Sequence, residues 1–256
     1  MTKKKYDFIC SIGAACSCAQ SLISAGLRTT SGPFDWLWGS DFLGRINILC
    51  SDFYRFIKKD DLISCGYNNG DAKNLCDIYK NEYTKLVLNH DFPSGIALED
   101  SYDDVAQKYE RRINRMLSNI NDAKCVLLVY IETPDTDNHT SNEDIIQGYE
   151  QIKNRWPNKT IDILYFTNDL LLSPRHYRLE HLSDNVTKIT ANYKKQSPDA
   201  VSYAVDTRFV RDMLRKYAKL KQPLYKIIRK RLLKFIIQFI PNHNVRINLR
   251  KKWHLK

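Results

Sequence analysis

Short apolar runs alternate along the chain with longer segments whose apolar residues recur at helical spacing. Residues 6–11 form an apolar run that ends shortly before Gly13, and residues 16–27 then carry apolar side chains at helical spacing up to the turn at Gly26. This pattern predicts a strand, a tight loop and a helix that begins at Cys16.

Four further apolar runs predict strands, and two amphipathic segments predict helices between them. The strands are expected at 85–89, 125–132, 161–167 and 186–191, and the helices at 103–120 and 143–156. Strands that alternate with helices indicate an α/β fold with a mostly parallel sheet flanked by helices, a Rossmann-like layering. Ligands of such sheets bind beyond the carboxyl ends of the strands. The candidate site residues at this edge are Cys16, His90, Asp91, Glu132, Asp135, Asn168 and Asp169.

The C-terminal part of the chain has a different character. Residues 208–256 contain sixteen Lys/Arg and the single acid Asp212, within a chain whose net charge is +11. Residues 224–240 place aliphatic and aromatic side chains on one helical face and cations on the other. We therefore expect an α/β domain over residues 1–207 and a tail over residues 208–256 that contains a basic amphipathic helix.

Residues 224–256 are expected to bind an anionic membrane surface. Charges interrupt the apolar run too often for it to span a bilayer, whereas an interfacial helix uses both faces. The alternative is a terminal helix that packs its apolar face against the domain. Nucleic acid is disfavoured as a partner, because a phosphate backbone would bind the cations but would leave the apolar face without a contact.

The N-terminus and the cysteines predict a location inside the cell. The N-terminus is Lys-rich, but the apolar run that follows is too short for a secretory signal. The seven cysteines are an odd number without paired CxxC clusters, which indicates reduced thiols. The expected location is the cytoplasm, in peripheral association with the inner face of the membrane.

Cys16 is the best-placed nucleophile among the cysteines. It is expected at the start of a helix, where backbone N–H groups and the helix dipole favour a thiolate. The alternative is a small buried residue at a tight turn. His90 follows an apolar run and is a candidate general base and acid for this thiol, with Asp91 or Asn168 to orient its ring.

The segment 31–36, Ser-Gly-Pro-Phe-Asp-Trp, combines a turn with two large aromatic residues. Asp35 is expected either to cap a helix that begins near Trp36 or to bind substrate. Asp35, Trp36 and Glu132 are therefore the candidate substrate-binding residues.

No cofactor and no metal site are expected. Asp135-Thr-Asp137 with His139 close by matches the pattern of metal-dependent glycosyltransferases. However, Ser141-x-x-Asp144 follows directly and is typical of a helix start, so these acids fit an exposed loop better.

Three segments carry a resemblance to a known family: Ser11-Ile-Gly-Ala-Ala-Cys16 with Gly26-Leu-Arg28, Ser31-Gly-Pro-Phe-Asp-Trp36, and Asn89-His-Asp-Phe-Pro93. Over mainly residues 6–93, the chain resembles the bacterial domain-of-unknown-function family labelled "putative papain-like cysteine peptidase". The resemblance implies a thiol hydrolase with Cys16 as nucleophile and His90 as base, acting on a peptide or acyl substrate. The papain signature Cys-Gly-Ser-Cys-Trp is absent.

Two alternatives to the hydrolase stay open. One is a membrane-associated glycosyltransferase, or a related enzyme of cell-surface polysaccharide biosynthesis, held at the membrane by the basic tail. The other is a non-catalytic interaction protein.

Overall fold

The computed structural model of the chain describes residues 3–68, 75–136, 139–197, 200, 204–221 and 232. Met1–Leu220 form one compact unit and Lys221–Lys256 a second, and every helix and strand named below lies in the first. The expected helix over 224–240 lies outside the described residues, except for Leu232. The division between residues 207 and 208 stays a prediction.

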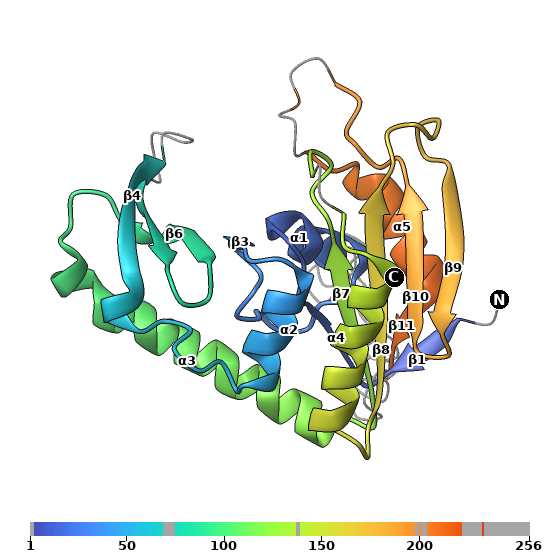
Figure 1. Cartoon of the computed structure of the whole chain (residues 1–256), viewed down its shortest axis with the longest axis horizontal. Coiled ribbons are helices and arrows are strands. Elements are labelled where there is room, and N and C mark those ends of the chain that lie inside the picture. Colours follow the sequence, from blue (N-terminus) through green and yellow to red (C-terminus); the bar gives the residue numbers. More distant parts are fainter. Residues whose placement is uncertain are drawn as a thin grey trace, which may run out of the picture. The chain divides into compact units, whose positions relative to one another are not determined.

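A five-stranded mixed sheet forms the centre of the first unit (Figure 1). Its order is β2-β7-β8-β10-β9, and β9 alone within it runs antiparallel to its neighbour. The strands are β2 (Phe8–Ser11), β7 (Cys125–Ile131), β8 (Thr160–Asn168), β9 (Tyr177–Ser183) and β10 (Val186–Ala191). A two-stranded parallel pair, β1 (Lys4–Tyr6) with β11 (Ala218–Leu220), completes this part of the unit.

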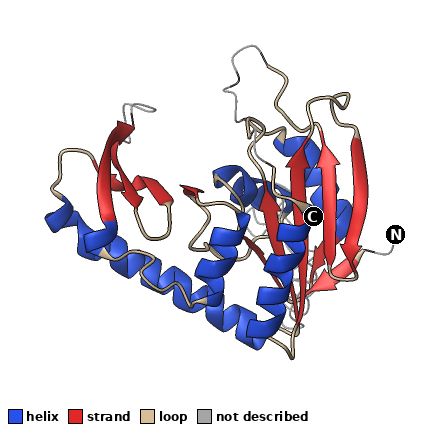
Figure 2. Cartoon of the chain, in the orientation of Figure 1, coloured by secondary structure: helices blue, strands red, loops and turns tan. Residues whose placement is uncertain are grey.

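Helices cover both faces of the five-stranded sheet (Figure 2). The apolar residues of α1 (Cys16–Ala25) and α5 (Thr207–Tyr217) share one core with one set of strand side chains. Those of α2 (Phe42–Cys50), α3 (Leu98–Asp122) and α4 (Asn142–Arg155) share the other. Because β7 and β8 lie between these two layers, they are almost continuously buried, and their sequences are nearly uninterrupted apolar runs. The edge strand β9 is largely exposed.

A second, wholly antiparallel sheet corrects the expectation of one mostly parallel sheet. Its order is β3-β6-β5-β4, with β3 (Leu37–Gly39), β4 (Leu62–Asn68), β5 (Cys76–Asn81) and β6 (Leu86–Pro93). A 3-10 turn (Lys59–Asp61) precedes β4. The apolar run at 85–89 was expected in the parallel sheet but belongs to β6 of the antiparallel sheet. A buried strand has the same apolar pattern in both kinds of sheet, so the sequence of one strand does not show with which strands it pairs.

The helix boundaries follow local signals that the sequence shows. Helix α1 ends at Gly26, whose φ of 71° is the left-handed conformation that glycine adopts without strain. Helix α4 is capped by Ser141, as expected. The expected cap at Asp35 is wrong, since α2 begins at Phe42 and is capped by Asp41. Among the described residues, no helix is long and apolar enough to cross a membrane.

Candidate functional site

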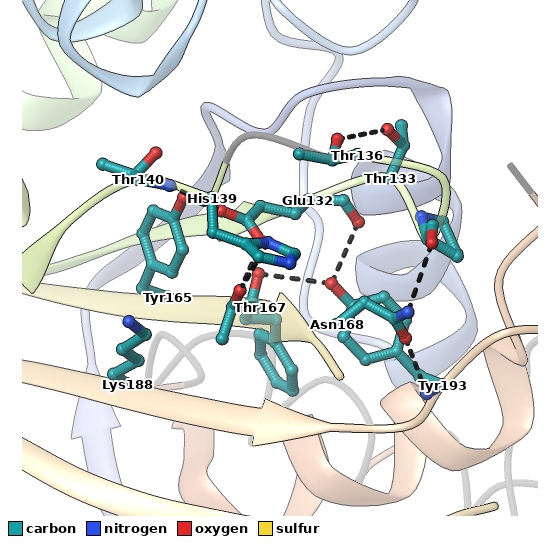
Figure 3. A network of polar contacts seen from close by, with 12 residues as sticks. Glu132, Thr133, Thr136, His139, Thr140, Tyr165, Thr167, Asn168, Lys188 and Tyr193 are labelled. Carbon is teal, nitrogen blue, oxygen red and sulfur yellow. Dashed lines mark hydrogen bonds and ion pairs between the residues drawn. The ribbon is translucent and has the colours of Figure 1, made fainter. Parts of the chain in front are cut away.

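A cleft of about 640 Å³ lies at the carboxyl edge of β8 and β10. We call it the carboxyl-edge cleft. Its polar side chains come from the loop after β7, from the end of β8, and from β9, β10 and the segment after β10. They include His139, Thr167, Asn168, Arg178, Lys188 and Lys194. Figure 3 shows His139, Thr167, Asn168 and Lys188 among them. The cleft lies at the edge of the sheet where the sequence predicts a site, and the function of that edge stays a prediction.

Glu132 is the buried centre of the polar network beside this cleft. It is the first residue after β7 and is 3% exposed. Its carboxylate accepts hydrogen bonds from the Tyr165 hydroxyl (2.5 Å) and the Thr167 hydroxyl. It also accepts from the Thr140 N–H (3.2 Å) and contacts the ring of His139. These hydrogen bonds replace those that the buried carboxylate would form with water. Burial and the nearby carboxylate raise the pKa of the Tyr165 hydroxyl.

The ring of His139 is held by Glu132 and faces the cleft. His139 Nδ1 lies 2.8 Å from Glu132 Oε2 and 3.1 Å from Thr167 Oγ1 (Figure 3). Because a carboxylate only accepts hydrogen bonds, Nδ1 must be the donor, and the neutral ring then has its lone pair on Nε2. The His139 side chain is 45% exposed. This orientation suits a hydrogen-bond acceptor or general base at the cleft.

Asn168 fixes the loops around the cleft. Its amide nitrogen donates to the Pro134 carbonyl (3.2 Å), and its Oδ1 accepts from the Tyr193 N–H (3.1 Å). The Tyr193 hydroxyl in turn donates to the Glu132 carbonyl (3.0 Å). Within the part of the chain that the structure describes, these partners of Asn168 do not include His90.

Basic side chains outnumber acidic ones along the cleft. Arg178 pairs with Asp169 at 2.8 Å. Lys188 Nζ donates to Asn142 Oδ1 at 2.8 Å, and neither Lys188 nor Lys194 has a carboxylate within ion-pair distance among the described residues. These two ammonium groups are therefore available to an anion in the cleft.

Cys16 begins α1 at the end of the loop that follows β2. The Ala14 N–H donates to the Ile131 carbonyl (3.3 Å), which places this loop beside the end of β7. The N-cap residue Ala15 offers no side-chain cap. The backbone N–H groups of Cys16 and Ser17 lower the pKa of the Cys16 thiol, but burial raises it more. The helix N-terminus thus favours the thiolate as expected, but burial opposes this effect and is the larger influence on the pKa.

Arg45 joins the segments that carry the family resemblance. Its guanidinium is completely buried and donates from Nη2 to the carbonyls of Ala14 (3.0 Å), Leu37 (3.1 Å) and Gly39 (2.9 Å). Burial lowers its pKa to about 10. Arg45 thereby connects the loop before Cys16 to β3, and β3 pairs with β6, which contains His90. Three segments distant in sequence therefore lie on neighbouring elements.

Asp35 and Trp36 lie in the turn that leads into β3. Asp35 is buried, and its Oδ2 accepts from Arg28 Nε (2.9 Å) and from the Gly32 N–H (2.7 Å). Burial raises the pKa of Asp35 against these opposing interactions. Trp36 is half-buried. Their substrate-binding role stays a prediction, and the contacts of Asp35 show that it also holds its own turn.

His90 and Asp91 point to different surroundings. His90 is exposed on β6 and shares no hydrogen bond with Cys16 within the part of the chain that the structure describes. Asp91 is buried and accepts from Lys108 Nζ (2.6 Å) and the Tyr109 hydroxyl (2.8 Å), both on α3. The catalytic roles of Cys16, His90, Asp91 and Asn168 stay predictions.

The motif segments and the part of the cleft up to Asp169 fall inside one recognised family, whereas Arg178, Lys188 and Lys194 follow the matched range. Residues 7–169 match the family described as "Putative papain-like cysteine peptidase (DUF1796)". The chain belongs to this family. The DUF1796 match extends from β2 to the end of β8 and so includes both Cys16 and the Glu132–His139 pair. No curated protein and no solved structure matches the chain.

Three residues that line the cleft in this DUF1796 member were not among the site candidates from the sequence: Lys188, Lys194 and His139, of which His139 was considered only beside the Asp135-Thr-Asp137 pattern. His139 follows Glu132 by seven residues, and only the folded loop returns it to the strand end. Lys188 lies inside β10, where its position along a pleated strand decides which face it occupies. For His139, the sequence signal that could have indicated the site is the polar stretch between the end of β7 and the helix cap Ser141.

Proposed function

We propose that the chain is a thiol hydrolase of the papain-like type, with Cys16 as the nucleophile. The observation that supports this most is the position of the thiol at the N-terminus of α1, which no side chain caps. There the N–H groups of Cys16 and Ser17 lie against the sulfur. Membership of the DUF1796 family gives independent support.

The proposed reaction uses these N–H groups as an oxyanion site. Sulfur attacks the acyl carbon, a C–S bond forms, and the carbonyl oxygen takes up the negative charge beside the N–H donors. The leaving group departs with a proton from the histidine, and water then hydrolyses the acyl-enzyme.

A base must act during the attack itself. Because burial raises the pKa of Cys16, the resting group is a thiol rather than a thiolate at neutral pH. We propose His90 as the residue that removes this proton, since β6 lies next to β3 and β3 is tied to the Cys16 loop by Arg45.

The pH dependence of iodoacetamide labelling at Cys16, read by mass spectrometry, tests this proposal. The rate should rise steeply with pH, because a raised pKa reduces the thiolate fraction at neutral pH. If His90 is the base that removes the thiol proton, His90→Ala should slow labelling of Cys16 at pH 7 by about tenfold or more. Cys16→Ala should abolish hydrolysis of acyl substrates.

Two controls make the result specific. The exposed Cys65 provides an internal reference in the same sample, and the exposed His176→Ala variant provides a histidine control. Labelling of Cys16 that is unchanged in His90→Ala would reject the Cys16–His90 pair.

A membrane-associated glycosyltransferase is the second candidate function. The carboxyl-edge cleft supports it, since ligands of α/β sheets bind at that edge, and the cationic residues 224–256 support a site at an anionic membrane surface. This function requires no thiol. Transfer activity that survives in Cys16→Ala would favour it over the hydrolase, and activity lost in that variant would exclude it.

A further inference from the structure

We propose that the carboxyl-edge cleft binds a phosphorylated hydroxyl compound of the size of a sugar phosphate. Lys188 and Lys194 would bind the phosphate, and His139 Nε2 would accept a hydrogen bond from a hydroxyl group. This inference deepens the second candidate function by naming the ligand chemistry. It is independent of Cys16.

The dimensions of the cleft fit a small molecule. Its volume of about 640 Å³ falls within the range of roughly 300–1,000 Å³ that is usual for small-molecule sites. Pro134, Leu170 and Leu171 give it an apolar wall, while its remaining side chains are polar. A lining in which polar side chains predominate suits a hydrophilic ligand, whose polar groups need hydrogen-bond partners when they leave water.

The charges of the cleft favour an anion. One of the two carboxylates that line it, Asp169, is already paired with Arg178. Lys188 and Lys194 carry no such partner among the described residues. A phosphate between them would form charge-assisted hydrogen bonds, and Lys188 would keep its contact with Asn142.

The histidine favours a hydroxyl group next to that anion. Glu132 is buried and its oxygens are occupied by protein donors, so it cannot itself bind the ligand. Its contact with Nδ1 fixes the ring of His139, which lines the cleft, and leaves Nε2 as the nitrogen for a ligand. Glu132 is therefore a positioning residue, and His139 is the group that meets the hydroxyl.

Isothermal titration of the full chain with three probes tests the assignment. The probes are glucose 1-phosphate, inorganic phosphate and glucose. We expect glucose 1-phosphate to bind most tightly, inorganic phosphate more weakly, and glucose without measurable heat. Binding of glucose that equals that of glucose 1-phosphate would overturn the phosphate assignment.

Single variants separate the two ends of the ligand. Lys188→Met and Lys194→Met should each weaken glucose 1-phosphate and inorganic phosphate alike, by about tenfold, which is the effect of one charge-assisted hydrogen bond. His139→Gln should weaken glucose 1-phosphate but leave inorganic phosphate unchanged. Lys153→Met, at an exposed position on α4, is the matched charge control and should change nothing.

The outcomes distinguish this inference from the proposed functions. Lys194 has no ion pair among the described residues, so its replacement tests the site even if Lys188→Met fails to fold. Equal binding by Lys194→Met and wild type would reject the phosphate site. Cys16→Ser should bind all probes as wild type does, whatever the labelling result. Binding without any sugar transfer would reject the transferase and keep the ligand site.

Discussion

At the scale of single residues, the buried side chain of Glu132 orients the ring of His139, and the exposed side chain of His139 lines the cleft. The carboxylate is 3% exposed and is surrounded by donors, so its geometry is fixed by the fold. The imidazole is half in solvent and has one nitrogen committed to that carboxylate. The other ring nitrogen, Nε2, therefore has a fixed orientation although the side chain stays accessible to solvent.

The tautomer of His139 is the first prediction. In ¹⁵N-labelled protein, neutral His139 should carry its proton on Nδ1, because Glu132 accepts from that nitrogen. In Glu132→Gln the preference should weaken, since an amide can donate as well as accept. NMR shifts of the two ring nitrogens measure the tautomer directly. The exposed ring of His90 should not change, and an Nε2–H tautomer of His139 in the wild type would contradict the assigned orientation.

At the scale of elements, Arg45 connects three of them with one side chain. Its donors satisfy the carbonyls of Ala14, Leu37 and Gly39, which belong to the Cys16 loop and to β3. Its positive charge has no carboxylate partner among the described residues. Burial lowers the pKa of Arg45 because it removes the charged guanidinium from water, which is unfavourable. We interpret Arg45 as the residue that holds the motif segments in register.

Replacing Arg45 gives the second prediction. Arg45→Met should destabilise the fold by about 3 kcal/mol or more, because each buried carbonyl left unpaired costs about 1–3 kcal/mol. Urea unfolding followed by circular dichroism measures the loss. Arg211→Met removes only an exposed pair with Asp212 and should change stability by less than about 0.5 kcal/mol. Similar stability of the two variants would refute the role of Arg45.

Gly148 gives the third prediction, at the contact between α4 and α2. A Cβ there would lie 2.6 Å from Cε1 of the Phe42 ring, which is itself buried between Tyr130 and Tyr165. Gly148→Ala should therefore lower the thermal midpoint, since overpacking costs about 1–3 kcal/mol and exceeds the gain in helix propensity of about 1 kcal/mol. Gln147→Ala, on the exposed side of α4, is the control. A raised midpoint in Gly148→Ala would mean that the two helices can separate.

The elements show how far local sequence signals reach. Helix α1 and strand β10 were predicted with nearly correct bounds, because their apolar patterns and end signals are local. The antiparallel sheet was missed, because β5 is only half-buried and β3 has three residues, so neither gives a clear pattern. The site was predicted only as an edge of the sheet. Glu132 directly follows β7 and Asn168 is the last residue of β8, whereas His139 reaches the edge through a loop whose path the sequence does not show.

At the scale of the whole molecule, the two proposed sites belong to different strands of one sheet. Cys16 follows β2, which is the edge strand, and the carboxyl-edge cleft lies over β8 and β10. Strand β7 separates them in the sheet order. This separation is the physical reason why variants at Cys16 and at Lys194 can be read independently.

Membrane association through residues 224–256 is the fourth prediction. The full chain should sediment with phosphatidylglycerol vesicles and not with phosphatidylcholine vesicles, since each cation near an anionic surface contributes about 1 kcal/mol. Replacing Arg229, Lys230, Arg231 and Lys234 with Gln should reduce binding by about tenfold or more. Lys153→Gln on α4 is the charge control. Sedimentation that is equal for both lipids would contradict an electrostatic anchor.

The pair formed by β1 and β11 sets an order for folding of the first unit. Lys4 lies beside Ala218 and Tyr6 beside Leu220, and Tyr6 also donates to the buried Asp162. Residues so distant in sequence meet late, because closing a long loop carries an entropic penalty before any contact offsets it. On the ribosome, β1 is synthesised long before β11 and must therefore wait for its partner. Until then β1 presents unpaired backbone groups, and this is the stage at which the nascent chain is most exposed to misassembly.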